Sequence, residues 1–283
     1  MRTSLIFFLV LFTAAPLSAQ KSGTAADQQR KTIAPSDEQV DQFILDSGLR
    51  RNLTNIKSTL ESEMSVKQGG AGNQRQLDRI AVEAFQPDSL EVSAFRFLKG
   101  RIDSTQMILI LRWLNSPLMK KFRFLEDTVF IPSAAKKMER YVKVLKSRPP
   151  MERRYVLVKR LEDAMRMTFR MQDLLAVMLR SSIAAMNASA PPEKQIAAPM
   201  IDQMIGQMNR ETTQNYRVRS YVALLYAYRT VSDEELLQYI QFYESTLGQW
   251  FVDSVHGASK RAVTVATEKM LAQASPIMKE EMK

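Results

Sequence analysis

Three residues that resemble the members of a hydrolytic triad lie close together near the C-terminal end of the chain: Ser245, Asp253 and His256. A serine nucleophile needs a histidine base, and the histidine needs a carboxylate that orients it. His256 is the only histidine of the chain. The sequence around Ser245 has neither a nucleophile elbow nor an oxyanion-hole motif. We therefore interpret His256 as a surface or half-buried helix residue and predict no catalytic residues and no enzyme activity.

Methionine is a second residue type that could do chemistry, because its thioether sulfur is a soft ligand for Cu(I). The chain has 17 methionines, and two groups of them follow helical spacing: Met165, Met167 and Met171, and Met200, Met204 and Met208. The same spacing places side chains on the buried face of a helix, where methionine fills irregular gaps. We interpret both groups as core positions and predict no metal and no cofactor. Ligands for a zinc-type site are lacking as well, since the chain has no cysteine and one histidine.

Basic residues point to acidic partners. Arg166, Arg170 and Arg180 alternate with apolar residues in a pattern that is typical of helices at membrane surfaces, although a solvated arginine face has the same pattern. The formal net charge is +10. An exported protein of this charge meets anionic lipid head groups, cell-wall polymers and acidic proteins rather than chromosomal nucleic acid. The simpler alternative is that the charge only aids solubility.

The N-terminus has the pattern of a secretory signal peptide. Arg2 precedes an apolar run from Leu5 to Ala15, and the small residues Ser18 and Ala19 follow. The run is shorter than the roughly 20 apolar residues that span a membrane, so we predict cleavage after Ala19; the alternative is an uncleaved N-terminal anchor.

Removing the predicted signal peptide, residues 1–19, removes one basic and no acidic residue, so the charge becomes +9. Residues 20–35 are polar apart from one isoleucine and predict a disordered leader. The absence of cysteine excludes disulfides and the lipid-modified cysteine of a lipoprotein. The predicted location is periplasmic or secreted, with no transmembrane helix in the mature chain.

Helical periodicity runs through the rest of the chain, whereas strand alternation and hairpin dipeptides are nearly absent. Ser36 and Gln39 form a capping box at the first helix, which Gly48 ends. Pro132 and Ser133 open a basic helix. Loops are predicted at 69–72 and 186–199. The predicted fold class is all-α, a multi-helix bundle.

Two segments of the chain share one pattern, residues 103–122 and 232–251. Aligned without a gap, they pair Asp103 with Ser232, Gln106 with Glu235, Ser116 with Ser245, Leu118 with Leu247 and Phe122 with Phe251. The apolar series Met107, Leu111, Leu114, Leu118 and Phe122 matches Leu236, Ile240, Tyr243, Leu247 and Phe251. Steps of three or four residues place each series on one helix face.

Each of the two segments predicts a capping box, a helix, a break at serine and a second helix. Any two amphipathic helices would share the apolar match, but the common caps and the serine at the break favour a duplication. Each unit then buries its apolar face against the other. We expect Leu118 and Leu247 to be buried.

The stretch Phe242-Tyr-Glu-Ser-Thr-Leu-Gly248, preceded by Ser232-Asp-Glu-Glu-Leu236, resembles the signature of the bacterial domain-of-unknown-function family 2059. Members of this family are exported helical proteins with the element Phe-Tyr-x-Ser-Pro-x-Gly after an acidic helix start. The resemblance covers residues 231–252, with a weaker second copy at 102–122. The family implies no reaction.

This sequence departs from the family pattern at a few positions. Thr246 stands where the pattern has proline. The first copy keeps Pro117, but it has Met119 in place of glycine and Trp113-Leu114 in place of Phe-Tyr.

The sequence therefore predicts two helical units, a degenerate copy at residues 36–150 and a copy similar to family 2059 at residues 151–283. The predicted function is that of an exported non-enzymatic protein that contacts an envelope protein or an anionic lipid surface, and not nucleic acid. The alternative is a carrier of an anionic lipid or another apolar ligand bound between the two units.

Overall fold

The computed structural model describes residues 34–66, 72–129 and 134–281, and every regular element in these ranges is helical. The predicted all-α fold class is thus confirmed. Some predictions lie outside the described residues: the signal peptide, nearly all of the leader, most of the glycine loop and the start of the basic helix at Pro132 and Ser133.

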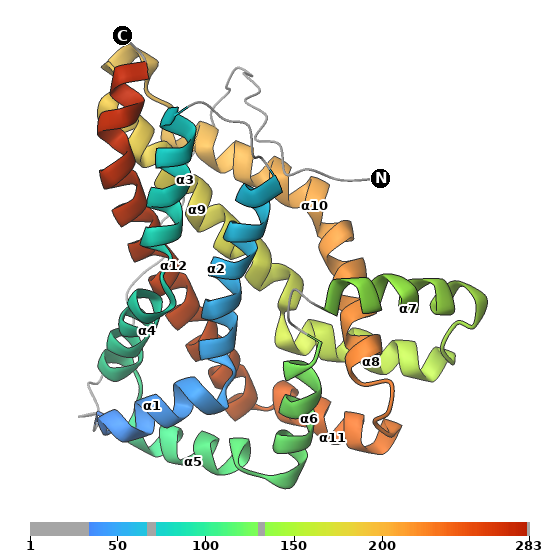
Figure 1. Cartoon of the computed structure of the whole chain (residues 1–283). Helices are drawn as coiled ribbons and strands as arrows, with labels where there is room; N and C mark the ends of the chain where they lie inside the picture. The colour runs from blue at the N-terminus through green and yellow to red at the C-terminus, as the bar shows by residue number, and fades with distance from the viewer. Residues whose placement is uncertain (1–33, 67–71, 130–133, 282–283) are drawn as a thin grey trace.

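The helices follow one another through short connections (Figure 1). The first six are α1 (Asp37–Asp46), α2 (Leu49–Val66), α3 (Gly72–Ala84), α4 (Pro87–Arg101), α5 (Ser104–Leu114) and α6 (Pro117–Asp127). They are followed by α7 (Ala135–Ser147), α8 (Glu152–Met165), α9 (Met167–Ser189), α10 (Ala198–Ala227), α11 (Asp233–Glu244) and α12 (Thr246–Glu281).

The loop predicted at 186–199 is shorter than expected. Helix α9 continues to Ser189, and a single 3₁₀ turn, Pro192–Lys194, precedes α10. Alanine and methionine favour helix up to that point, and the pair Pro191-Pro192 then ends it because proline cannot continue a helix. The first part of the predicted loop was therefore wrong.

At two sharp breaks between helices, one residue has a left-handed backbone conformation. Gly48, between α1 and α2, has φ of 75°, a region that glycine enters without steric penalty. Arg166, between α8 and α9, has φ of 51°, which is unfavourable for a residue with a Cβ atom. At the start of α1, the predicted capping box between Ser36 and Gln39 is present.

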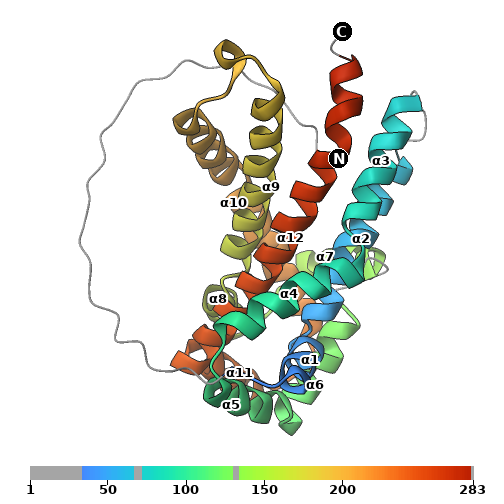
Figure 2. The same ribbon diagram turned by 90° about the vertical axis from the view of Figure 1, so that its left-hand side faces the viewer.

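Helix α12 is the central element of the bundle. It packs against α3 and α4 on one side and against α9 on the other, and Figure 2 shows it between the pair α2 and α3 and the pair α9 and α10. At the base of the molecule, α1 packs against α5 and α8 packs against α11. One hydrophobic core includes buried residues from both predicted units, for example Phe43, Leu98, Leu224 and Val255.

Candidate functional site

The three residues of the possible triad serve separate structural roles. Ser245 lies at the break between α11 and α12, where its Oγ donates to the carbonyl of Phe242 (2.6 Å) and accepts from the amide of Gly248 (3.1 Å). Asp253 forms an ion pair with Arg166. His256 instead bonds to Asp173 on α9. The hydroxyl, imidazole and carboxylate are therefore not arranged as a nucleophilic triad.

His256 is held between α12 and α9. Its Nε2 lies 2.7 Å from Oδ2 of Asp173, which Lys260 also contacts at 3.0 Å. Its Nδ1 is buried and has no hydrogen-bond partner among the described residues. Burial lowers the pKa of His256 below its usual value, and the charge of Arg170 adds to this, whereas Asp173 opposes it. A neutral imidazole that donates from Nε2 fits this environment.

Acidification is expected to destabilise the protein through His256. Because its pKa is lower in the folded chain, the unfolded chain takes up the proton first, and stability decreases as the pH falls below about 6.5. The loss levels off once the pH is below the folded pKa. We expect the urea midpoint to decrease between about pH 7 and pH 5.5. In His256→Gln, which keeps a donor for Asp173, this slope should disappear; the same slope in both proteins would contradict the assignment.

The two matched segments, 103–122 and 232–251, have the same hydrogen bonds at their breaks. The amide of Ser116 donates to the carbonyl of Trp113 (2.9 Å), and the amide of Ser245 donates to that of Phe242 (3.0 Å). The Oγ atoms accept from the amides three residues later, at 3.3 Å for Ser116 and 3.1 Å for Ser245. Each serine therefore caps the following helix.

The capping boxes of the two segments differ. Ser232 and Glu235 form the predicted box, and Glu235 also binds Lys121 on α6 (2.6 Å). Lys121 and the amide of Ser232 lower the pKa of Glu235. The box predicted for Asp103 and Gln106 is wrong: Asp103 caps α5 through the amide of Thr105 (2.8 Å) instead. The carboxylate of Asp103 thus accepts from the amide two residues later, whereas the hydroxyl of Ser232 accepts from the amide three residues later, that of Glu235.

Gly248 allows a close approach of α12 to the end of α11. A Cβ atom on this residue would lie 1.9 Å from the carbonyl oxygen of Phe242 and 2.8 Å from the Cα of Tyr243, both in the backbone. In the first segment, α5 ends one residue earlier relative to the break, with Asn115 outside the helix, and Met119 is accommodated as a buried residue.

Most side chains of the two matched apolar series are buried in the core. In both series the first, third and fifth residues are buried. Leu118 and Leu247 are half-buried against the core, so the expectation that they are buried was wrong; they lie at the edge of each apolar stripe.

The two segments also contact each other directly. Trp113 stacks on Phe242 with ring centroids 4.5 Å apart and an angle of 18°, and these two residues are aligned with each other in the sequence match. In addition, α5 packs against α12 and α6 packs against α11. The signature residues therefore meet at the contact between the two predicted units.

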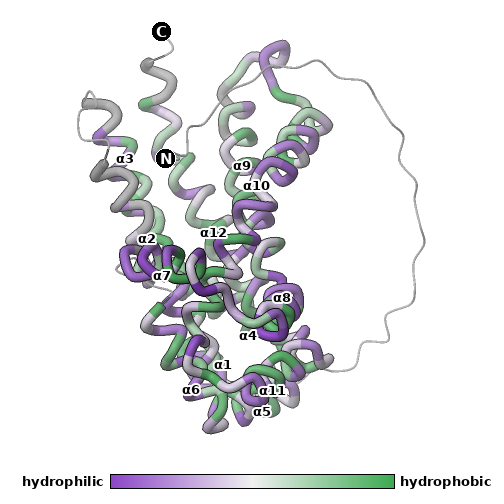
Figure 3. The backbone as a smooth tube through the Cα atoms, turned by 90° about the vertical axis from the view of Figure 1, so that its right-hand side faces the viewer, coloured by the Kyte–Doolittle hydropathy of each residue, from purple (hydrophilic) through white to green (hydrophobic). Residues whose placement is uncertain are grey.

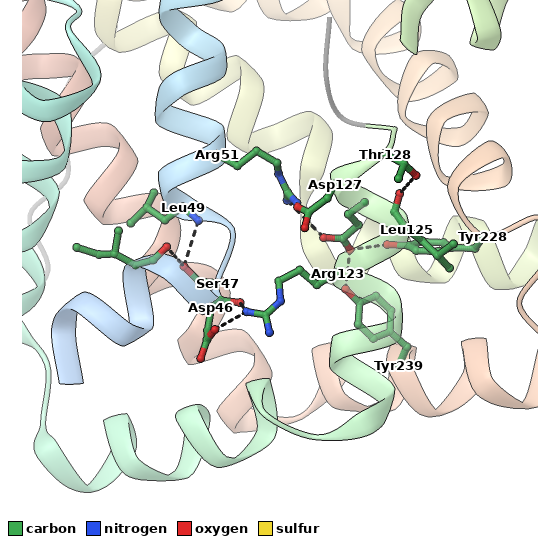
Figure 4. Close-up of polar contacts among 12 residues, drawn as sticks. Asp46, Ser47, Leu49, Arg51, Arg123, Leu125, Asp127, Thr128, Tyr228 and Tyr239 are labelled. Carbon is green, nitrogen blue, oxygen red and sulfur yellow. Dashed lines mark hydrogen bonds and ion pairs between the residues drawn. The ribbon is translucent and has the colours of Figure 1, made fainter. Parts of the chain in front are cut away.

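A buried polar cluster lies beside this contact (Figure 4). Glu126 on α6 accepts hydrogen bonds from the hydroxyls of Tyr228 (2.6 Å) and Tyr239 (2.7 Å). Its other oxygen lies 3.5 Å from Nη2 of Arg51 on α2. Tyr228 and Tyr239 are fully buried, and Phe122 stacks on Tyr239. Burial, with the charge of Glu126, raises the pKa of both tyrosines well above the usual value, so they stay protonated and donate.

A second polar contact next to this cluster fixes the turn between α1 and α2. Arg123 donates to the carboxylate (2.6 Å) and the backbone carbonyl (2.8 Å) of Asp46, and Asn115 donates to the same carboxylate (3.2 Å). Asp46 is buried. Sequence analysis missed both groups because their members lie far apart in the chain and look like ordinary surface charges.

The residues considered as metal ligands or membrane contacts have other surroundings. Met165 and Met167 pack against the core, whereas Met171 is exposed, so its interpretation as a core position was wrong. Arg180 pairs with Asp202 (2.6 Å). Arg166, which precedes α9, pairs with Asp253, whereas Arg170 on α9 forms no ion pair with another described residue. No group of three or more His, Asp or Glu side chains with metal-binding geometry occurs among the described residues.

One cavity of about 270 Å³ lies between α9, α10 and α12. Apolar side chains of Phe169, Val177 and Ile205 line it together with charged side chains that include Asp173 and Lys260. All of its lining residues belong to residues 151–283, so the cavity is within the second predicted unit and not between the two units.

Helix α7 carries an exposed row of basic side chains, which we call the cationic face of α7. Its members are Lys136, Lys137, Arg140, Lys143 and Lys146. None of them forms an ion pair with another residue in the part of the chain that the structure describes, and Glu139 is the only acidic residue of the helix. Figure 3 shows the hydrophilic character of this helix.

The other face of α7 is packed on the bundle. Met138, Tyr141 and Leu145 are half-buried and contact the core, and the hydroxyl of Tyr141 donates to the carbonyl of Leu225 on α10 (3.3 Å). The helix is therefore fixed with its charges directed away from α10.

Within the ranges described, none of the helices has a stretch long and apolar enough to cross a bilayer. No protein family, curated protein or solved structure matches this chain. The resemblance of residues 231–252 to family 2059 therefore stays a prediction.

Proposed function

We propose that this chain is an exported, non-enzymatic helical protein that acts by contact with an anionic component of the cell envelope. The observation that carries this proposal is the cationic face of α7, whose five basic side chains lack partners in the described part of the protein. Unpaired charges of one sign on a rigid helix attract and orient a partner of opposite charge.

The chemistry of the signature supports a structural rather than a catalytic role. Ser245 caps a helix, Glu235 closes a capping box, and His256 is held by Asp173. We propose in addition that residues 36–150 and 151–283 are diverged copies of one unit. The matched serine bonds, and the contact between Trp113 and Phe242, support this duplication.

Sedimentation with the envelope fraction of the source cell tests the contact function. We expect the purified mature protein to sediment with envelopes at low salt and the triple variant Lys136→Gln, Arg140→Gln, Lys143→Gln to stay in solution. The matched control replaces the exposed residues Arg75, Arg79 and Lys269 on α3 and α12 by glutamine, which removes the same charge elsewhere.

Equal sedimentation of all three proteins would contradict the proposed function. A carrier of an apolar ligand is the competing function, and the cavity between α9, α10 and α12 is the feature that favours it. Lipid that co-purifies with both triple variants in native mass spectra, together with unchanged sedimentation, would support the carrier instead.

A further inference from the structure

We infer that the cationic face of α7 and the connection from α7 to α8 form a docking surface for an anionic lipid bilayer. This inference rests on the proposed function and names the partner. Three features carry it: the spacing of the charges, the apolar residues beside them and the position of the surface at the periphery of the fold.

The charges are arranged for a flat anionic surface. Lys136, Arg140 and Lys143 follow at intervals of four and three residues and therefore lie on one side of the helix. Lys137 and Lys146 flank them on either side. A bilayer presents negative head groups over an area wide enough to meet all five at once, and polybasic helices bind anionic lipids in this way.

Apolar side chains lie next to the charges. Val144 on α7 is 49% exposed, and Met151, at the start of α8, is 77% exposed. Arg148 lies between them in the sequence and is exposed. Exposed apolar residues among cations distinguish a lipid surface from a soluble polyanion, because they can enter the boundary between head groups and acyl chains.

This surface lies at the periphery of the fold, where a membrane can reach it. Within the described residues, α10 is the element against which α7 has substantial contacts, and the connection between α7 and α8 lies at the right-hand edge of the molecule in Figure 1. Tyr141 and Tyr226 hold α7 on α10 through ring contact, with centroids 5.1 Å apart. Binding therefore needs no rearrangement of the bundle.

Vesicle binding tests the inference. We expect the protein to bind vesicles of phosphatidylglycerol and phosphatidylcholine at low salt, but not vesicles of phosphatidylcholine alone. Each basic residue near an anionic membrane changes the partition coefficient roughly fivefold. The triple variant Lys136→Gln, Arg140→Gln, Lys143→Gln should thus bind roughly 100-fold more weakly, whereas the control variant on α3 and α12 should bind like the wild type.

Two further measurements distinguish binding to a bilayer from binding to other anions. Met151→Ser should weaken vesicle binding several-fold and leave binding to soluble polyglutamate unchanged. Binding to anionic vesicles that is absent, or that is the same in the α7 triple variant, overturns the inference. Polyglutamate binding as tight as vesicle binding, with no effect of Met151→Ser, also overturns it but leaves the proposed function intact. Circular dichroism of every variant confirms that the fold is unchanged.

Discussion

Replacing Gly248 by alanine is expected to lower the free energy of unfolding by about 3 kcal/mol or more. The added Cβ would lie within 2.8 Å of three backbone atoms of Phe242 and Tyr243. A backbone cannot turn aside as a flexible side chain can, so α12 would have to move away from α11. Urea unfolding followed by circular dichroism measures the change.

Gly100, near the end of α4, is the matched control for Gly248. A Cβ at this position meets no atom within 4 Å, and alanine favours helix over glycine by roughly 0.5–1 kcal/mol. Gly100→Ala should therefore stabilise the protein slightly. Equal stability of Gly248→Ala and the wild type would show that the two helices do not need this close approach.

Replacing Glu126 by leucine is expected to destabilise the protein by about 3 kcal/mol, because its partly buried carboxylate accepts hydrogen bonds from two buried hydroxyls. The substitution removes the carboxylate to which the buried hydroxyls of Tyr228 and Tyr239 donate, and it leaves Tyr239 with the hydroxyl of Tyr243 (3.3 Å) as its remaining partner. Arg51 loses one of its two acidic partners. Unsatisfied buried donors lose the hydrogen bonds that water gives them in the unfolded chain.

Two variants define the role of the Glu126 carboxylate. Glu126→Gln keeps an acceptor oxygen and should lose only about 1 kcal/mol. Asp127→Asn alters the neighbouring, more exposed contact of Arg51, and a surface pair contributes about 0–1 kcal/mol. If Glu126→Leu were no worse than Asp127→Asn in urea unfolding, the cluster would not hold the two halves together.

Local features of this fold could be predicted from the sequence because their physical causes are local. The capping boxes at Ser36 and Ser232 each depend on two residues three positions apart. The break at Ser245 follows from a serine between two apolar periods. Proline at 191 and 192 sets the end of α9, although favourable residues carried that helix further than the prediction.

The polar clusters could not be predicted, because they join elements that are distant in the chain. Glu126 lies on α6, whereas its partners Tyr228 and Tyr239 lie just after α10 and on α11. No periodicity in the sequence distinguishes Glu126 from the other glutamates. For the same reason, the hydrogen bond between Asp173 and His256 could not be predicted from the sequence. The pairing of Arg166 and Arg180 with aspartates likewise depends on the packing of α9.

The cationic face of α7 could be predicted only in part from the sequence. Its charge was visible as a basic helix in the sequence, yet the residues considered there as a membrane contact were Arg166, Arg170 and Arg180, with a solvated arginine face as the alternative. In the structure, Arg166 and Arg180 have acidic partners, whereas the basic side chains of α7 are exposed and form no ion pair within the described part of the chain.

The stacking of Trp113 on Phe242 has a consequence for symmetry. When a residue meets its own counterpart, the two lie beside a two-fold axis, as they do in an isologous dimer. The reciprocal packing of α5 with α12 and of α6 with α11 obeys the same relation. Under the duplication proposed above, the two halves meet as subunits of a fused dimer.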